Sequence, residues 1–239
     1  MQAFETLDEV KLPDGRPLTL HRRGDDFWIH LDGAELMSSR APGTEQALAT
    51  YGCAGLEKVA RPRVLVGGLG FGFTVRAALE ALPPRGEVVV AEKFSAVVDW
   101  NREVLGGLYA KTLANRRVKV ALGDVRRCLA PDAAFDAILL DVDNGPSAWC
   151  LRSNGWLYRP PGLAALFESL CPGGTLAVWS AFEDRTFLRE LRRAGFEASS
   201  KGARSRGFKG TRDIIFLGQR PKNPRRGAAR RPPRRRSRR

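Results

Sequence analysis

Apolar positions gather in short, unbroken runs along most of the chain, and each run is followed by a segment of helical character. Unbroken runs rich in Val, Ile and Leu are typical of strands that helices cover on both faces. Such strands are expected at 63–68, 87–92, 117–124, 135–141 and 174–180. Helices are expected at 73–82, 95–105, 125–130, 161–170 and 184–194. The alternation predicts an α/β fold with a Rossmann-like, doubly wound, mostly parallel sheet, closed by two strands at 196–200 and 213–218.

Before this alternation, the chain shows the pattern of a small antiparallel unit. Residues 18–23 and 27–31 are β-prone, and Gly24, Asp25 and Asp26 between them are typical of a hairpin turn. A short third strand is expected to follow, and after it a helix whose N-cap would be Thr44.

We therefore divide the chain into three parts. Residues 1–43 form a β-hairpin region with the third strand at 36–37, and residues 44–220 form the Rossmann-like domain, which opens with a helix at 44–60. Residues 221–239 form a tail with ten Lys and Arg residues and no acid. Because the tail has nothing apolar to bury, we expect it to be disordered. It either makes a weak contact with nucleic acid or another polyanion, or is a solvated appendage.

The remaining composition is that of an ordinary globular protein. The 239 residues, 43% of them hydrophobic, suffice for one α/β domain with a full core. The amino terminus carries acids, and no stretch approaches the roughly 18 consecutive apolar residues of a membrane span. The four cysteines form no CxxC pair and the two histidines show no ligand spacing, so we expect reduced thiols and no metal site. These features predict a cytoplasmic protein without a membrane span, either a monomer or a homodimer.

A glycine-rich loop follows the first strand of the alternating pattern. Gly67, Gly68, Gly70 and Gly72 lie between that strand and the next helix. Glycines let the chain turn sharply and let a ligand approach the backbone, and the helix offers free N–H groups at its amino end. Glycine turns also serve packing, so the loop alone is weak evidence of a binding site. No GK[ST] follows it, which excludes a phosphate loop.

Two acids end the strands that follow. Glu92 ends the second strand, where a carboxylate can accept hydrogen bonds from a ribose diol. Asp124 ends the third strand, where it can accept a hydrogen bond from an adenine amino group. Since parallel strands bring their carboxyl ends to one edge, these residues predict a nucleoside site, and a dinucleotide suits their order less well. The alternatives are a surface acid at Glu92 and a simple turn at Asp124.

In the order GGLGFG, AEKF, GDV, LLDVDNGP and LCPGG, these motifs resemble those of class I S-adenosylmethionine-dependent methyltransferases, most closely the spermidine synthase-like branch. The likeness covers about residues 15–218 and includes LDGAELMSS after the hairpin. The resemblance implies that Glu92 binds the ribose, Asp124 the adenine and the glycine loop the methionine-like tail, and that Asp141 faces the reacting centre. It implies S-adenosylmethionine or its decarboxylated form as the cofactor.

The chain departs from spermidine synthases at three places. The family carries an acid in its loop, GGGDGG, which helps to hold the free amine of decarboxylated S-adenosylmethionine, and this chain has Gly70 there. The family's DSSDP is replaced by DVDNGP at 141–146, and its DExxYHE-like acceptor motif survives only in fragments at 44–51. These departures argue against ordinary putrescine chemistry, but not against nucleoside binding, and they favour methyl transfer or an unusual acceptor.

The segment after the fourth strand carries the candidate catalytic residues. An amine must be neutral to attack a sulfonium, so a nearby carboxylate can position it and take its proton. Asp141 and Asp143 would share one face of an extended segment. Trp149, Trp156 and Tyr158 follow and could wall an acceptor pocket. Alternatively, the residues after Asp141 form a tight turn and the aromatic residues cover a sheet edge, which is the role that we favour for them.

The sequence therefore predicts a spermidine synthase-like transferase, connected with polyamine biosynthesis, that moves a methyl or aminopropyl group to a small, amine-bearing acceptor. Two alternatives stay open. One is an RNA or protein methyltransferase that the basic tail anchors to its substrate. The other is a non-catalytic nucleoside-binding module.

Overall fold

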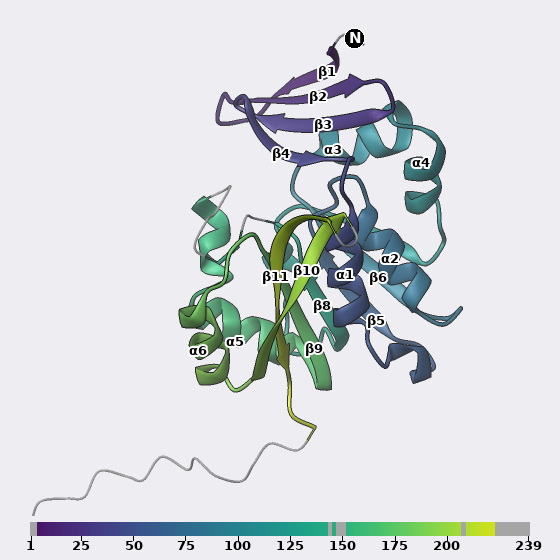
Figure 1. Cartoon of the computed structure of the whole chain (residues 1–239). Helices are drawn as coiled ribbons and strands as arrows, with labels where there is room; N and C mark the ends of the chain where they lie inside the picture. The colour runs from purple at the N-terminus through teal and green to yellow at the C-terminus, as the bar shows by residue number, and fades with distance from the viewer. Residues whose placement is uncertain (1–3, 143–144, 147–151, 207–208, 223–239) are drawn as a thin grey trace, which may run out of the picture.

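The computed structural model describes residues 4–142, 145–146, 152–206 and 209–222, which form two β-sheets and the helices around them (Figure 1). The N-terminal sheet is antiparallel with the strand order β1-β2-β3-β4. Its strands are β1 (Glu5–Lys11), β2 (Pro17–Arg23), β3 (Asp26–Leu31) and β4 (Ala34–Ser38). The expected hairpin is β2–β3 and the expected third strand belongs to β4. The sequence pattern misses β1 because the charged residues of ETLDEVK hide its strand character.

A seven-stranded sheet forms the centre of the molecule, in the order β10-β11-β9-β8-β5-β6-β7. Its strands are β5 (Arg63–Gly67), β6 (Glu87–Glu92), β7 (Val118–Leu122), β8 (Phe135–Leu140), β9 (Leu170–Ser180), β10 (Glu197–Arg206) and β11 (Lys209–Gln219). Strands β5 to β9 run parallel to one another, whereas β11 is antiparallel to both β9 and β10. This is the expected doubly wound, mostly parallel sheet with its closing pair.

Helices pack against both faces of this sheet. On one face lie α1 (Gly43–Gly52), α2 (Phe73–Ala81) and α3 (Ser95–Asp99), and on the other lie α5 (Pro160–Ser169) and α6 (Arg185–Arg193). The connections contain α4 (Gly107–Leu113), η1 (Leu56–Lys58), η2 (Trp100–Val104), η3 (Val125–Cys128) and η4 (Arg152–Trp156). Successive strand residues serve the two cores in turn: Val64 and Val66 pack on the first face and Leu65 on the second. This two-sided burial explains the unbroken apolar runs.

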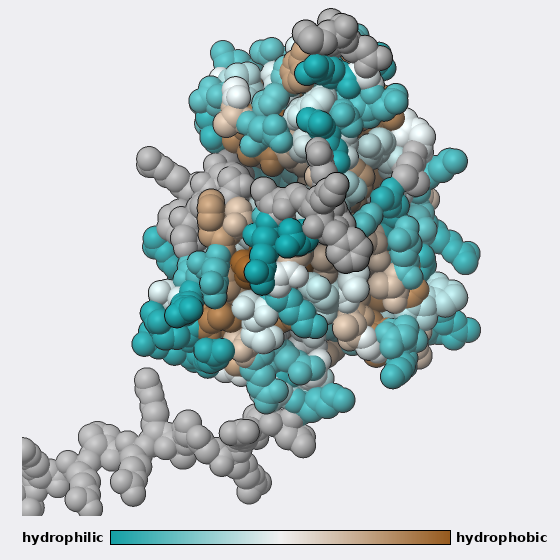
Figure 2. Space-filling view, in the orientation of Figure 1, coloured by the Kyte–Doolittle hydropathy of each residue, from teal (hydrophilic) through white to brown (hydrophobic). Residues whose placement is uncertain are grey.

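The N-terminal sheet packs against the first of these faces. Leu18 and Leu20 of β2 and Ile29 and Leu31 of β3 are buried in the core that also contains α1, α2 and α3. This shared core anchors the N-terminal sheet across one end of the large sheet, next to α3 and α4 (Figure 1). Hydrophilic residues cover most of the face shown in Figure 2, with apolar residues scattered among them. None of the described helices is both long and apolar enough to cross a membrane.

The helix expected at 44–60 is shorter than predicted. It corresponds to α1, which begins at Gly43 and ends at Gly52, and the chain then turns through Gly55, whose φ is +88°, into η1. The prediction that Thr44 caps this helix is wrong, because the helix begins before it and no side-chain cap bond is formed.

The helix expected at 95–105 changes character halfway. At Trp100 the α-helix α3 gives way to the π-helix η2. The Trp100 indole Nε1 donates a hydrogen bond of 2.6 Å to the Asp8 carboxylate of β1, and the Asn101 side chain donates to the Gly70 carbonyl oxygen at 2.8 Å. These long-range contacts coincide with the distortion, and helical periodicity alone does not reveal them.

Candidate functional site

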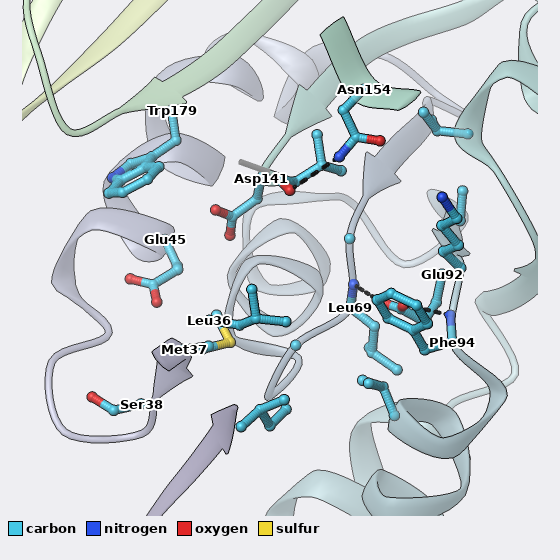
Figure 3. Close-up of a pocket in the computed structure, with 18 of the residues that line it drawn as sticks. Leu36, Met37, Ser38, Glu45, Leu69, Glu92, Phe94, Asp141, Asn154 and Trp179 are labelled. Atoms are coloured by element: carbon cyan, nitrogen blue, oxygen red, sulfur yellow. Dashed lines mark hydrogen bonds between the residues drawn. The ribbon is translucent and has the colours of Figure 1, made fainter. Parts of the chain in front are cut away.

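A cavity of about 330 Å³ lies between β4 and the carboxyl ends of β5, β6, β7 and β8 (Figure 3). Open α/β sheets bind their ligands at this edge. The cavity is lined by part of the glycine loop, by Glu92, Asp124 and Asp141, and by Leu36 and Met37 of the N-terminal sheet. The structure thus brings Gly68, Gly70, Glu92, Asp124 and Asp141, which lie at or just after the ends of four separate strands, to one pocket.

The glycine loop has a packing role as well as a place in the cavity wall. Gly68 and Gly70 line the cavity, while Gly67 ends β5 and Gly72 precedes α2. Gly68 has a φ of +89°, and a Cβ there would collide with the backbone carbonyl oxygen of Asp141. Glycine is therefore required at 68 by the close approach of β8, whatever the loop binds.

Met37 occupies the space beside Gly70. A Cβ on Gly70, whose φ is +49°, would collide with the Met37 sulfur. The same sulfur accepts a hydrogen bond from the Phe71 backbone N–H at 3.3 Å. The N-terminal sheet therefore closes one side of the loop with a thioether, at the position where the resembled family carries an acid.

Glu92 is buried at the end of β6, with 6% of its surface exposed. Its carboxylate accepts hydrogen bonds from the backbone N–H groups of Leu69 at 2.8 Å and Phe94 at 2.9 Å (Figure 3). Burial raises the pKa of Glu92, although these backbone hydrogen bonds oppose the shift. The backbone N–H groups of Lys93 and Gly70 also lower this pKa, so the Glu92 carboxylate ties the glycine loop to the end of β6.

Asp124 lies at the start of η3 and caps it. Its carboxylate accepts a hydrogen bond from the Arg126 backbone N–H at 3.0 Å and pairs with the Arg126 guanidinium at 2.7 Å. Burial alone would raise the pKa of Asp124, but the hydrogen bonds and charge of Arg126 and the charge of Lys93 outweigh it, so the pKa is lowered. This end of the cavity therefore carries an ionised acid with cations beside it.

Asp141 follows β8 and lies towards the other end of the cavity (Figure 3). Its Oδ2 accepts a hydrogen bond from the Thr74 hydroxyl at 2.9 Å, and its backbone N–H donates to the Gly67 carbonyl oxygen at 3.0 Å. Burial raises the pKa of Asp141 to about 6, against the lowering effect of the Thr74 hydrogen bond. Asp143, the second candidate catalytic residue, lies outside the described residues.

Glu45 lines the cavity at the same end as Asp141, and it belongs to the stretch 44–51 in which the acceptor motif of the resembled family survives only in fragments. It belongs to the first turn of α1 and is 8% exposed, and the Thr44 hydroxyl donates a hydrogen bond of 2.9 Å to its carboxylate. Burial, followed by the charges of Asp141 and Asp213, raises the pKa of Glu45 to about 7. In the sequence, an acid in a first helical turn is more simply explained by the helix dipole.

Asp213 is a further acid at this end that the sequence analysis does not assign. It is 6% exposed and belongs to β11, where the next residue, Ile214, pairs with Ser180 at the carboxyl end of β9. The antiparallel direction of β11 therefore brings Asp213 to the edge where the parallel strands end. The weak signal in the sequence is a charged residue directly before an apolar run. Within the described ranges, no group of three or more His, Cys, Asp or Glu residues is arranged to hold a metal ion.

Trp179 of β9 supplies an aromatic ring to the acidic end (Figure 3). Its indole Nε1 is buried and has no hydrogen-bond partner among the described residues. Tyr158 packs in the core against Phe187, with ring centroids 5.8 Å apart, and the Arg126 guanidinium lies 5.7 Å from the ring centroid of Trp156. Neither Tyr158 nor Trp156 lines the cavity. Trp149 lies outside the described residues, as does the tail from 223 onwards.

Comparison with known proteins gives one partial match in sequence and clear matches in fold. No family model matches the chain. A protein-L-isoaspartate O-methyltransferase from Methanopyrus kandleri is 28% identical over 116 residues, which are 48% of this chain and 43% of that protein. The match thus spans less than half the length of the relative.

Two crystal structures of spermidine synthases share the fold. One is a complex with the transition-state analogue AdoDATO, with a TM-score of 0.68, and the other is the enzyme from Thermotoga maritima, with a TM-score of 0.69. Each is 15% identical, and the alignments cover 92% of this chain and 74% of the neighbour. The expected Rossmann-like fold is confirmed, and the chain shares it with these spermidine synthases.

Proposed function

We propose that this protein binds S-adenosylmethionine or its decarboxylated form and transfers a methyl or aminopropyl group from the sulfonium to a small amine. The observation that carries the proposal is that one cavity has two chemically different ends. Glu92 lies at one end with the loop residue Leu69, and Glu45 and Asp141 lie at the other (Figure 3). Asp124 lines the cavity with Lys93 beside it, and the charge of Asp213 acts on Glu45. The fold of the spermidine synthases and the partial likeness to a methyltransferase support this class of reaction. We place the reaction in the cytoplasm, as the composition predicts.

The first end suits an adenosine. Asp124 would accept a hydrogen bond from the adenine amino group and Glu92 would accept them from the ribose diol. Phe94 and Val125 line the cavity between these acids and offer apolar surface to the purine ring. The sulfonium would then lie beside Gly68 and Gly70, where glycine backbone allows close approach.

The second end suits a cation that is to become a nucleophile. The buried carboxylates of Glu45 and Asp213 and the half-buried one of Asp141 attract an ammonium group, and the Trp179 ring beside them offers a face to it. A nitrogen held near the alkyl carbon can attack it in line with the carbon–sulfur bond, whose electron pair leaves with the sulfur. Positioning the two reactants in this way is a large part of catalysis.

The charge distribution bears on the form of the cofactor. Among the described residues that line the cavity, Lys93 supplies the positive charge, and its charge acts on Asp124 at the nucleoside end. A tail carboxylate near Asp141 would meet three acids, whereas the decarboxylated tail brings only an amine. We therefore expect the decarboxylated nucleoside to bind more tightly.

Calorimetric titration with the two nucleosides, side by side, tests the proposal. Binding of either one supports a sulfonium nucleoside site, and a preference for S-adenosylmethionine would assign methyl transfer instead of aminopropyl transfer. If the protein binds neither nucleoside, the proposed function is wrong. The RNA or protein methyltransferase and the non-catalytic module stay predictions, because the described residues do not favour either.

Asp124→Ala is expected to weaken nucleoside binding about 10- to 150-fold, because it removes one hydrogen bond to a charged group, typically about 1.5–3 kcal/mol. Glu92→Ala should weaken binding at least as much and also lower the melting temperature, since it frees the N–H groups of Leu69 and Phe94. Asp132→Ala, at an exposed site outside the cavity, is the matched control. Unchanged affinity in both strand-end variants would contradict the assignment.

Restoring an acid at position 70 tests the choice of cofactor. Gly70→Asp alone should bind both nucleosides poorly, because its Cβ meets the Met37 sulfur, although Asp tolerates the left-handed conformation better than most residues. In the double variant that also carries Met37→Ala, the ratio of affinities should shift about tenfold or more in favour of the decarboxylated nucleoside. A shift of this size corresponds to one hydrogen bond from its amine to the new carboxylate. Met37→Ala alone is the control. The wild-type ratio of affinities in a folded double variant would count against this role of position 70.

A further inference from the structure

Glu45 is a buried acid that opens into the cavity and that the nucleoside contacts leave unused. It is 8% exposed, and the Thr44 hydroxyl holds its carboxylate through a hydrogen bond of 2.9 Å. Figure 3 shows Glu45, Asp141 and Trp179 at the same end of the cavity. A carboxylate fixed in this position is a candidate to contact the acceptor.

The groups that face Glu45 are mainly acids. Asp141 after β8 and Asp213 of β11 raise its pKa through their charges, in addition to the larger effect of burial. The exposed Glu35 of β4 also lines the cavity.

Two cations on elements packed against α1 are engaged with other groups, and two more, Arg204 of β10 and Arg212 of β11, are exposed. The Lys201 ammonium of β10 lies over the Tyr51 ring, 4.6 Å from its centroid, and Arg76 of α2 lies 3.8 Å from the Glu80 carboxylate. Within the described part of the chain, Glu45 forms no ion pair. Its carboxylate is therefore available to a cationic ligand.

We propose that Glu45 takes the proton from the acceptor amine, while Asp141 holds the amine against the sulfonium. The inference rests on the proposed function. The ammonium transfers one proton to the Glu45 carboxylate, and the freed nitrogen lone pair forms the new bond to the alkyl carbon. The carbon–sulfur bond breaks with its electron pair on sulfur, which leaves a neutral thioether nucleoside. Glu45 returns its proton to water as the products leave.

The two acids have different environments, and this difference assigns the roles. Each acid accepts a hydrogen bond from a threonine hydroxyl, Asp141 from Thr74 and Glu45 from Thr44, so this contact favours the ionised form of both, and the neighbouring charges make the difference. Glu45 has two acids near it, so protonation relieves repulsion there, and its pKa of about 7 lies near the operating pH, where a general base is most effective. Because the two groups interact, the titration steps belong to the pair.

A pH profile of turnover tests the assignment. The rate should rise with pH up to about 7, because the base must be ionised to accept a proton. Glu45→Gln keeps the shape of the side chain and an oxygen that can accept the Thr44 hydrogen bond. We expect it to lower kcat about 100-fold and to remove or move the inflection in the pH profile. Its nucleoside affinity should stay within about threefold of the wild type. Glu57→Gln, at an exposed acid of η1 outside the cavity, is the control for the change in charge.

A binding measurement keeps the test independent of turnover. The protein is first saturated with 5′-methylthioadenosine, which has no sulfonium and cannot donate an alkyl group. This complex is then titrated near pH 6.5 with 1,4-diaminobutane and with other alkyl amines. Titrations in two buffers of different ionisation heat give the number of protons released on binding. Amine binding to the wild type should release protons, since the cation forces Glu45 to ionise. The Glu45→Gln variant should release less than half as many.

The outcomes separate the inference from the proposed function. Turnover within threefold of the wild type with the same pH inflection, or unchanged proton release, would overturn the role of Glu45. A wild type that binds the nucleoside but no amine of the panel would overturn it as well and leave the nucleoside site standing. Failure to bind either sulfonium nucleoside would instead contradict the proposed function itself.

Discussion

Replacing Asp141 by Asn should lower kcat/KM for alkyl transfer by about 10²–10³-fold, the usual effect of removing one preorganised electrostatic partner of the reacting centre. The amide keeps the volume of the side chain and an oxygen for the Thr74 hydroxyl, which now donates to Oδ2 at 2.9 Å. What is lost is the negative charge at the middle of the acidic end. We expect the loss mainly in kcat, measured with the amine and sulfonium nucleoside that the wild type turns over.

Thr74→Val provides the matched control for this prediction. It removes the hydrogen bond to Asp141 but leaves the charge, so its effect should be about tenfold or less, in keeping with one hydrogen bond of about 1.5 kcal/mol. If Asp141→Asn turned over within tenfold of the wild type, Asp141 would not stand at the reacting centre. Equal losses in the two variants would contradict the larger contribution that we assign to the charge of Asp141.

Gly68→Ala is expected to abolish nucleoside binding and to lower the melting temperature strongly. The added Cβ collides with the Asp141 carbonyl oxygen, a backbone atom that cannot move away without displacing the end of β8. Left-handed backbone costs about 1–2 kcal/mol in a residue with a Cβ, and overpacking typically adds about 1–3 kcal/mol. At roughly 2–4 °C for each kcal/mol in a chain of this size, the melting temperature should fall by about 5–20 °C.

Gly72→Ala separates the collision from the backbone strain. Gly72 also has a positive φ, +72°, but the nearest atom to a Cβ there lies 3.7 Å away, which is ordinary contact. Its variant should therefore show only the strain of about 1–2 kcal/mol and keep most of the nucleoside affinity. Thermal denaturation and calorimetry measure the two variants. If both lost the same melting temperature and the same nucleoside affinity, the collision with the Asp141 carbonyl oxygen would not explain the effect of Gly68→Ala.

The fold was predictable from the sequence where local pattern and tertiary environment agree. The strands at 63–68, 87–92 and 135–141 are covered on both faces, so each contains an unbroken apolar run. These runs are too short for a typical buried helix, and their length therefore indicates strands. Prediction failed where distant contacts intervene. The helix at 95–105 is distorted where Trp100 and Asn101 bond to β1 and to the glycine loop, and helical periodicity carries no trace of either partner.

The candidate site divides in the same way. The place of Glu92 and Asp124 in the cavity wall was predictable because each lies at or just beyond the carboxyl end of a strand, and parallel strands bring such positions to one edge. Glu45, Asp213 and Met37 were not, because each lies on an element that reaches the cavity by packing: a helix face, an antiparallel strand and the N-terminal sheet. The residues that flank these three in the sequence do not reveal that their side chains reach the cavity.

By itself, the amino-acid sequence determined the order of strands and helices, the position of the glycine loop and the acids at the strand ends, because these depend on short-range pattern and on the direction of the chain. Only the tertiary structure decided that a thioether instead of an acid faces Gly70 and that three carboxylates share the far end of the cavity. The physical reason is that burial and charge act between side chains brought together in space. The raised pKa values of Glu45 and Asp141 therefore exist only in the folded chain.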